Sequence, residues 1–301
     1  ALRRELGLTP ATGGSTRVEP PPTVAPLPVP AFAAAPPGVP RPPIPGGQPP
    51  RHDVVCLPII DWEFRFQRPQ QLMARYAAAG HRVFYVSQRF RETGPPVELR
   101  ELRERLFEVS LRAPALNVYR DAPGPALESL LAGLDRLRRD AALGATALVV
   151  QLPFWWPLAE RARARFAWPI VYDCLDLHRG FSTNETPMLE LESALLAGAD
   201  LVLASAAALE HEARRHNANV LRLPNACEFE HFAGIPARHP GDRPVIGYYG
   251  AISDWFDSPL VAELAARHPE WHFLLVGSTY GADLGPLRER ANVELVGEVP
   301  Y

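Results

Sequence analysis

The sequence predicts an α/β protein with two doubly wound domains built on parallel sheets, the second of them incomplete. Asp53–Ser87 holds a complete strand, crossover helix and strand, and this alternation repeats as far as Leu223. A second alternation of the same kind begins at Pro244. Repeated strand and helix alternation is typical of parallel sheets with helices on both faces.

The first unit shows the expected signals most clearly. Val54–Ile60 is nearly all apolar, as a strand buried on both faces requires, and Arg82–Ser87 predicts the next strand. Between them Pro69 fits the first turn of a helix and Gly80 fits the residue just past its end. The residues predicted to share the apolar face of this helix are Leu72, Met73, Tyr76 and Ala77.

The later elements follow the same periodicities. The expected strands are Leu106–Leu111, Leu116–Tyr119, Ala145–Leu152, Pro169–Cys174, Asp200–Ser205, Asn219–Leu223, Val245–Tyr249, His272–Val276 and Val293–Val296. The expected helices are Pro125–Ala142, Pro157–Phe166, Pro187–Ala197, Ala206–His216, Ser258–His268 and Leu284–Arg290.

The domain organisation follows from composition. Many of the 34 prolines crowd into residues 1–50, and a stretch so poor in aromatic residues predicts a disordered linker. Residues 51–238 form the expected first domain, and residues 239–301 form the first part of the second. Three strands and two helices are about half of such a domain, so we expect the chain to be a segment of a longer protein.

Charge and cysteine usage narrow the function classes. The net charge is -3 and the sequence has no block of like charge, which argues against a nucleic-acid partner. Three widely spaced cysteines favour a reduced, cytoplasmic setting. The longest apolar stretch, Ala194–Leu209, is interrupted by Asp200 and is shorter than the roughly 20 residues that cross a bilayer.

The loop after the first strand is the first candidate site. It lies at the carboxyl end of the sheet, where open α/β sheets bind ligands. Arg65 and Arg68 stand at a helix start and are suited to bind an acidic group or a phosphate, with Trp62 packing on the ligand. The alternative is a surface network in which these arginines pair with Asp61 or Glu63.

A second candidate cluster follows strand Pro169–Cys174. Asp173, Asp176 and His178 lie at the strand end and in the next loop, where a carboxylate can orient a hydroxyl or act as a base. The alternative is capping of nearby backbone amides. We expect no metal here, because one short acidic motif is common by chance, and His211 and His216 are five residues apart, a spacing that does not suit a zinc helix.

The third candidate site is in the second domain. Gly250, Ala251, Ile252 and Ser253 precede a helix start and are placed to offer backbone amides to a phosphate, unless they form a plain turn. A dinucleotide-dependent oxidoreductase is disfavoured. The first strand-to-helix turn has no glycine, and GYYGAISDW lacks the third glycine of the dinucleotide fingerprint.

Several stretches resemble a known family. WEFRFQRPQQLM, YDCLD, LPNACEFEHF and IGYYGAISDWFD, the last followed by HPEWHFLLVG, are similar to bacterial glycosyltransferases of the GT-B architecture with a family 4-like acceptor domain. The resemblance covers Asp53–Tyr301. It implies two facing Rossmann-like domains, the first binding the acceptor and the second the nucleotide sugar, with no metal or other cofactor needed for catalysis.

Within such an enzyme we expect the candidate residues described above to take the following roles. Asp173 and Asp176 would be catalytic, Trp62, Arg65, Arg68 and His178 would bind the acceptor, and Gly250, Ala251, Ile252 and Ser253 would hold the donor phosphates. The acceptor would be a glycan or lipid-linked precursor of the cell envelope or an exopolysaccharide, used in the cytoplasm or at the inner face of the membrane. The family's donor-holding glutamates lie downstream of the last strand, so we expect residues 1–301 alone to be inactive. Two alternatives stay open: a non-catalytic binding module of the same fold, and a dinucleotide or sugar-nucleotide enzyme of another reaction class.

Overall fold

The computed structural model describes residues 51–121, 123–180, 186–233 and 243–299. The predicted linker over residues 1–50 lies outside the described residues, as does most of the predicted boundary between the domains. Within the described residues no helix is both long enough and apolar enough to cross a membrane.

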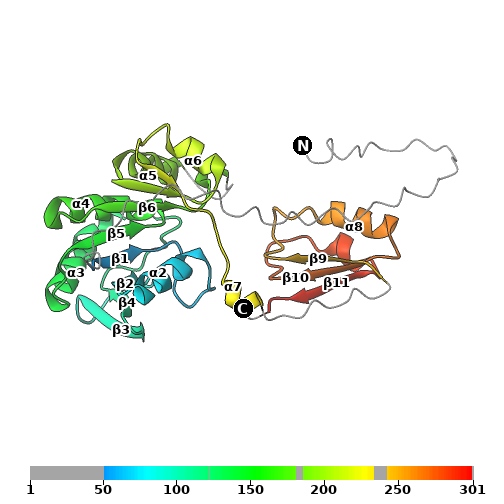
Figure 1. The fold of residues 1–301 in the computed structure, drawn as a ribbon, viewed down its shortest axis with the longest axis horizontal. Coiled ribbons are helices and arrows are strands. Elements are labelled where there is room, and N and C mark those ends of the chain that lie inside the picture. The colour runs from blue at the N-terminus through cyan, green and yellow to red at the C-terminus, as the bar shows by residue number, and fades with distance from the viewer. Residues whose placement is uncertain (1–50, 122, 181–185, 234–242, 300–301) are drawn as a thin grey trace. The chain divides into compact units, whose positions relative to one another are not determined.

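The first part of the described chain forms an eight-stranded sheet in the order β3-β4-β2-β1-β5-β6-β7-β8 (Figure 1). The strands pair in parallel except β3, which runs antiparallel to β4. Their bounds are β1 Asp53–Leu57, β2 Arg82–Val86, β3 Val97–Arg103, β4 Leu106–Leu111, β5 Thr146–Val150, β6 Ile170–Cys174, β7 Leu201–Ala204 and β8 Val220–Arg222. This architecture confirms the predicted fold class.

Helices connect the parallel strands and cover both faces of the sheet. They are α2 Arg68–Ala78, α3 Leu127–Asp140, α4 Trp156–Phe166, α5 Thr186–Gly198 and α6 Ala207–Ala213, and the short helix α7 Phe229–Ala233 follows the last strand of this sheet. Three 3-10 turns also occur among the described residues: η1 Gly124–Ala126, η2 Pro153–Trp155 and η3 His178–Gly180.

Strand β1 shows why its sequence is apolar throughout. Val54 and Cys56 pack into the core beneath α2, whereas Val55 and Leu57 pack into the larger core on the opposite face. Side chains alternate across a strand, so a strand covered on both faces needs apolar residues at every position.

Helix α2 begins and ends where the sequence predicts. Gln67 and Gln70 form a capping box at its start, and Pro69 lies between them in the first turn. Gly80 has a φ of 94° just past the end, a conformation that glycine adopts without strain. Met73 and Ala77 are buried on the predicted apolar face.

Two predictions fail in the segment between β2 and α3. Leu116–Tyr119 is not a strand, because the Asn117 side chain accepts a hydrogen bond from the Tyr119 amide at 3.0 Å and fixes a turn. Strand β3 was missed because three charged side chains and Leu99 are exposed in succession, in place of an apolar pattern. Strand β1 is also shorter than predicted and ends before Pro58.

The second part of the described chain forms a three-stranded parallel sheet in the order β11-β10-β9. The elements are β9 Val245–Tyr249, α8 Ser258–Arg267, β10 His272–Val276, α9 Gly285–Arg288 and β11 Val293–Gly297, which confirms the predicted alternation. Ile252, Ala262, Leu275 and Leu287 form its small core.

Candidate functional site

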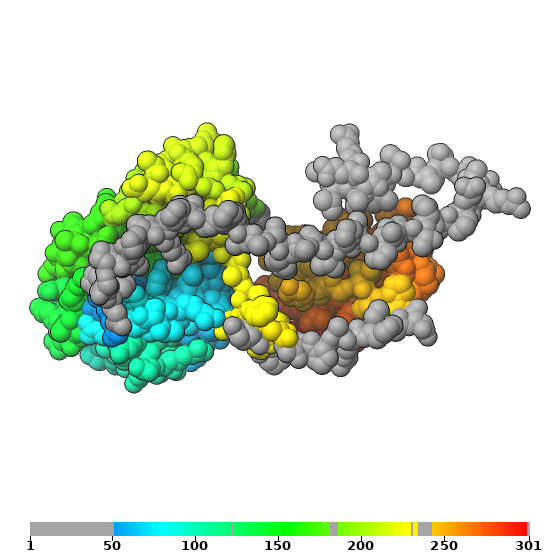
Figure 2. Space-filling model, in the orientation of Figure 1, coloured from blue at the N-terminus to red at the C-terminus, as the bar shows by residue number. Residues whose placement is uncertain are grey.

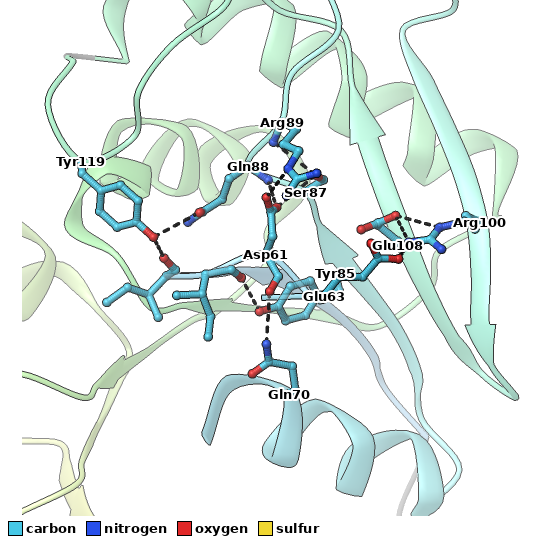
Figure 3. Close-up of polar contacts among 12 residues, drawn as sticks. Asp61, Glu63, Gln70, Tyr85, Ser87, Gln88, Arg89, Arg100, Glu108 and Tyr119 are labelled. Atoms are coloured by element: carbon cyan, nitrogen blue, oxygen red, sulfur yellow. Dashed lines mark hydrogen bonds and ion pairs between the residues drawn. The ribbon is translucent and has the colours of Figure 1, made fainter. Parts of the chain in front are cut away.

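The loop that leaves β1 is fixed by side chains that hydrogen-bond its backbone carbonyls (Figure 3). The carbonyl of Pro58 accepts from Trp155 Nε1 at 2.8 Å and Gln88 Nε2 at 3.0 Å, that of Ile60 from the Tyr85 hydroxyl at 2.6 Å, and those of Asp61 and Trp62 from Gln70 Nε2 at 3.2 Å. The Tyr119 hydroxyl donates to Ile59. Five successive carbonyls are therefore held by residues from elsewhere in the chain.

The carboxylates of this loop belong to the same scaffold. Asp61 accepts from Ser87 Oγ at 3.1 Å, the Gln88 amide at 2.8 Å and Arg89 Nε at 3.0 Å (Figure 3). Glu63 pairs with Arg100, 2.7 Å away, which also binds Glu108. Asp61 and Glu63 thus pair with Arg89 and Arg100, and the alternative that placed them with Arg65 and Arg68 is wrong.

Arg68 lies at the start of α2 and its guanidinium binds two other segments. Nε and Nη2 donate to Asp173 Oδ1 at 3.0 and 2.7 Å. Nη1 donates to the carbonyl of Leu223 at 2.8 Å and to Asn225 Oδ1 at 3.2 Å. Only 9% of the Arg68 side chain is exposed. These bonds favour a structural role for the guanidinium over direct binding of a ligand.

Asp173 is the penultimate residue of strand β6, and its carboxylate is fully buried. Burial raises its pKa, while the hydrogen bonds and charge of Arg68 and a hydrogen bond from Gln151 Nε2 at 3.1 Å act in the opposite direction. Gln151 in turn accepts from Cys56 Sγ at 3.7 Å. A buried polar chain therefore runs from β1 through the ends of β5 and β6 to α2.

Asp176 lies in the loop after β6 and lines a surface hollow. Its carboxylate has no hydrogen-bonding or ion-pair partner in the part of the chain that the structure describes, and burial raises its pKa. Of the two predicted catalytic carboxylates, this is the one that faces open space.

The hollow lies between α2 and the crossover segment, which we define as Leu223–Cys227. Figure 2 shows this side of the molecule, where the yellow crossover runs beside the blue surface that contains α2. Polar lining groups that the sequence analysis did not single out are Gln71, Arg75 and Asn225, and Gln67 of the loop after β1 lines the hollow as well. A signal existed for part of this set, because Arg68, Gln71 and Arg75 recur at helical spacing and so share one face of α2.

Trp62 and Arg65 have contacts within the loop region. The Trp62 ring meets Tyr85 edge-on at 5.2 Å between ring centroids and Phe66 at 5.9 Å, so its apolar area packs on protein. The Arg65 guanidinium lies 4.8 Å above the ring of Phe64, which is 58% exposed. Acceptor binding by either residue stays a prediction.

His178 follows Asp176 in the chain but is not among the residues that line the hollow. It is buried, and burial lowers its pKa to about 4, which keeps the imidazole neutral at pH 7. Its predicted part in acceptor binding also stays a prediction.

The predicted phosphate loop follows β9. The amides of Gly250 and Ile252 donate to the carbonyls of Val276 and Ser278 at 2.9 and 2.8 Å, and the Ile252 side chain is buried in the second core. The Ala251 and Ser253 amides have no partner among the described residues. Of the four predicted amides, only those of Ala251 and Ser253 are thus left to donate to a phosphate. Phosphate binding there stays a prediction.

Comparisons with known proteins agree with this architecture. Residues 67–226, more than half of the chain, match the family model for the glycosyl transferase 4-like domain. No curated protein matches the chain.

Solved structures show the same fold at low identity. The chain is similar to sucrose-phosphate synthase from Thermosynechococcus elongatus, with 18% identity, coverage of 83% of this chain and 71% of that one, and a TM-score of 0.62. It is also similar to the catalytic domain of starch synthase IV from Arabidopsis thaliana bound to ADP and acarbose. The identity there is 10%, the match covers 84% of this chain and 75% of that one, and the TM-score is 0.55. For Anabaena HepE in complex with UDP and glucose, the identity is 13%, the match covers 83% of this chain and 70% of that one, and the TM-score is 0.52.

Proposed function

Because the chain belongs to the glycosyl transferase 4-like family, we propose that it transfers a glycosyl group from a nucleotide-sugar donor to a hydroxyl of a glycan or lipid-linked acceptor. The structures of two proteins with the same fold contain a nucleoside diphosphate, which supports a nucleotide-sugar donor. The acceptor would be a cell-envelope or exopolysaccharide precursor, used in the cytoplasm or at the inner face of the membrane.

The observation that carries this proposal is the position of Asp176. Its carboxylate lines the hollow at the carboxyl end of the first sheet and has no cation beside it among the described residues. Asp173 is the weaker candidate for the catalytic base, because its carboxylate is buried against Arg68. We therefore assign to Asp176 the orientation and deprotonation of the acceptor hydroxyl.

The proposed step balances without a further reactant. The acceptor oxygen forms a bond to the anomeric carbon of the donor while the bond from that carbon to the diphosphate oxygen breaks. The hydroxyl proton passes to Asp176, and the electron pair of the broken bond leaves with the nucleoside diphosphate. The Ala251 and Ser253 amides are the proposed donors to the diphosphate.

The test is the release of nucleoside diphosphate by the full-length protein, supplied with UDP-, ADP- and GDP-sugars and candidate lipid-linked acceptors. Asp176→Asn should lower kcat by about 10²–10⁴-fold, the usual contribution of a general base. The parent should lose activity as the pH falls through the pKa of Asp176, which burial places above that of an ordinary aspartic acid. The matched control is Asp140→Asn, which removes an exposed carboxylate paired with Arg136 on α3. Equal kcat values for Asp176→Asn and the parent would remove Asp176 from the mechanism.

A further inference from the structure

Arg68 connects three segments that lie far apart in the sequence. It is a residue of α2, it binds the carboxylate at the end of β6, and it donates to two acceptors in the crossover segment. The residues joined are 105, 155 and 157 positions away from it. A planar guanidinium can serve such partners together, because its donors point in several fixed directions.

Among the described residues, the crossover segment has few other hydrogen bonds to the sheet. Beyond β8 the Leu223 amide donates to the carbonyl of Ala204 at 2.9 Å, and Pro224 has no amide hydrogen. Asn225, Ala226 and Cys227 are exposed and line the hollow, opposite the face of α2 that carries Gln71 and Arg75. The width of the hollow on this side therefore depends on what holds the crossover.

We infer that Arg68 is a positioning residue: charge-paired to Asp173, it holds the crossover segment Leu223–Cys227 against the end of the sheet and so sets the wall of the hollow opposite α2. The buried carboxylate supplies the anchor, since Asp173 is itself held by Gln151 from the end of β5. Arg68 then shapes the acceptor site through the position of the crossover segment, although its side chain also lines the hollow. The part of this inference that concerns the acceptor rests on the proposed function, whereas the part that concerns the crossover does not.

The chain contains a close counterpart of this arrangement at the opposite end of the sheet. Arg82 binds both oxygens of Asp53 at 2.7 and 2.6 Å and donates to the carbonyls of Ala141 and Ala142. Asp53 also accepts from the Gly144 amide at 3.0 Å, as Asp173 accepts from Gln151. Both clusters thus join an arginine, an aspartate and two backbone or side-chain oxygens of another segment.

The test replaces each ion pair by apolar residues of similar size and measures amide hydrogen exchange. Exchanging both partners of a buried pair avoids a stranded charge, so the fold is expected to survive. In Arg68→Met with Asp173→Leu, the Leu223 amide should exchange roughly ten- to a hundredfold faster, as expected when two hydrogen bonds to the crossover are lost. In the control variant Arg82→Met with Asp53→Leu, the Leu223 amide should exchange at the same rate as in the parent.

A single variant keeps the test decisive if the double variant does not fold. Arg68→Lys keeps a positive charge for Asp173 but lacks the planar fork, so it should also speed exchange at Leu223, while Arg82→Lys should not. Unchanged exchange at Leu223 in the Arg68 variants, or equal acceleration in the Arg82 variants, would overturn the inference.

An activity measurement then addresses the acceptor site. In an active full-length protein, Arg68→Lys should raise the KM for the acceptor about tenfold and leave the KM for the donor unchanged, whereas a general loss of stability would move both. Equal changes in the two KM values would overturn the link to the acceptor. If no variant and no parent shows turnover, the proposed function fails, but the exchange result still decides whether Arg68 holds the crossover.

Discussion

Asp173 and Asp176 are three positions apart, yet their carboxylates have opposite surroundings. Asp173 is still part of β6, so its side chain must point into one face of the sheet, where an unpaired charge would be costly and Arg68 pairs with it. Asp176 comes after the strand has ended and reaches the hollow. The sequence places both at a strand end but does not reveal which one is paired, because the partner is 105 residues away.

Glu192 is a second carboxylate whose surroundings predict a measurable effect. It lies on α5, and burial raises its pKa to about 7, against smaller opposing effects from a Tyr172 hydrogen bond and the charge of Arg179. Glu212 of α6 and His216, just beyond the end of that helix, line the same small cavity. Because the folded state binds the proton more tightly than the unfolded state, this group's stabilising contribution is complete below about pH 4.5 and is lost as the pH rises towards 7.

Glu192→Gln, which mimics the protonated acid, should therefore reduce the loss of stability that occurs as the pH rises towards 7. The variant should be more stable than the parent at pH 8 by about 1–2 kcal/mol, a value reduced from about 3 kcal/mol for such a pKa shift because the group is partly solvated. Urea unfolding at pH 5 and pH 8 measures the difference. Glu190→Gln, an exposed change on the same helix, serves as the control. Parallel pH profiles for Glu192→Gln and the parent would contradict the prediction.

At the scale of elements, the loop after β1 behaves as a rigid part of the sheet edge. Its carbonyls are bound by side chains from α2, β2, the segment after β2, the turn at Tyr119 and the 3-10 turn before α4. Gln70 is the most connected of these groups, since its amide donates to two carbonyls and its Oε1 accepts from the Gln67 amide at 3.1 Å.

Replacing Gln70 by leucine should destabilise the protein by about 2–4 kcal/mol, because three buried or part-buried hydrogen bonds are lost and their partners are left without a substitute. Thermal or urea unfolding measures the loss. Gln71→Leu, the neighbouring change on the more open side of α2, should cost about 0.5 kcal/mol or less. A Gln70→Leu variant as stable as Gln71→Leu would show that water replaces the lost bonds and that the loop does not depend on them.

At the scale of the whole molecule, sequence pattern predicted the strands and helices whose burial is periodic. The bounds of β10 agree with the prediction at both ends, and β1, buried on both faces, was found from its apolar run. The sequence pattern did not predict β3, because most of its side chains are exposed and charged and it is a strand only through its pairing with β4. The same limit applies to the site: residue types at strand ends predict where side chains gather, whereas Arg68 with Asp173 and Asn225 is a long-range contact that local pattern does not contain.

The charged border at β3 supports a prediction about behaviour at high concentration. Val97, Leu99 and Glu101 alternate along one face of this edge strand before its register irregularity, and Glu101→Val would turn that face apolar. This variant should associate as concentration rises, which sedimentation velocity measures. Glu160→Val, an exposed change on α4, should not associate. A monodisperse β3 variant at the highest concentration measured would contradict the prediction.

The two borders of the eight-stranded sheet are therefore poor templates for another polypeptide. A strand added beside β3 would bring its own side chains against alternating acidic and basic groups, whose hydration it would have to displace. A strand added beside β8 would find only three residues of ladder, Val220–Arg222, too few to hold a partner. Sheet growth from one copy of the chain into the next is thus disfavoured at both borders, even though the strands between them are almost wholly apolar.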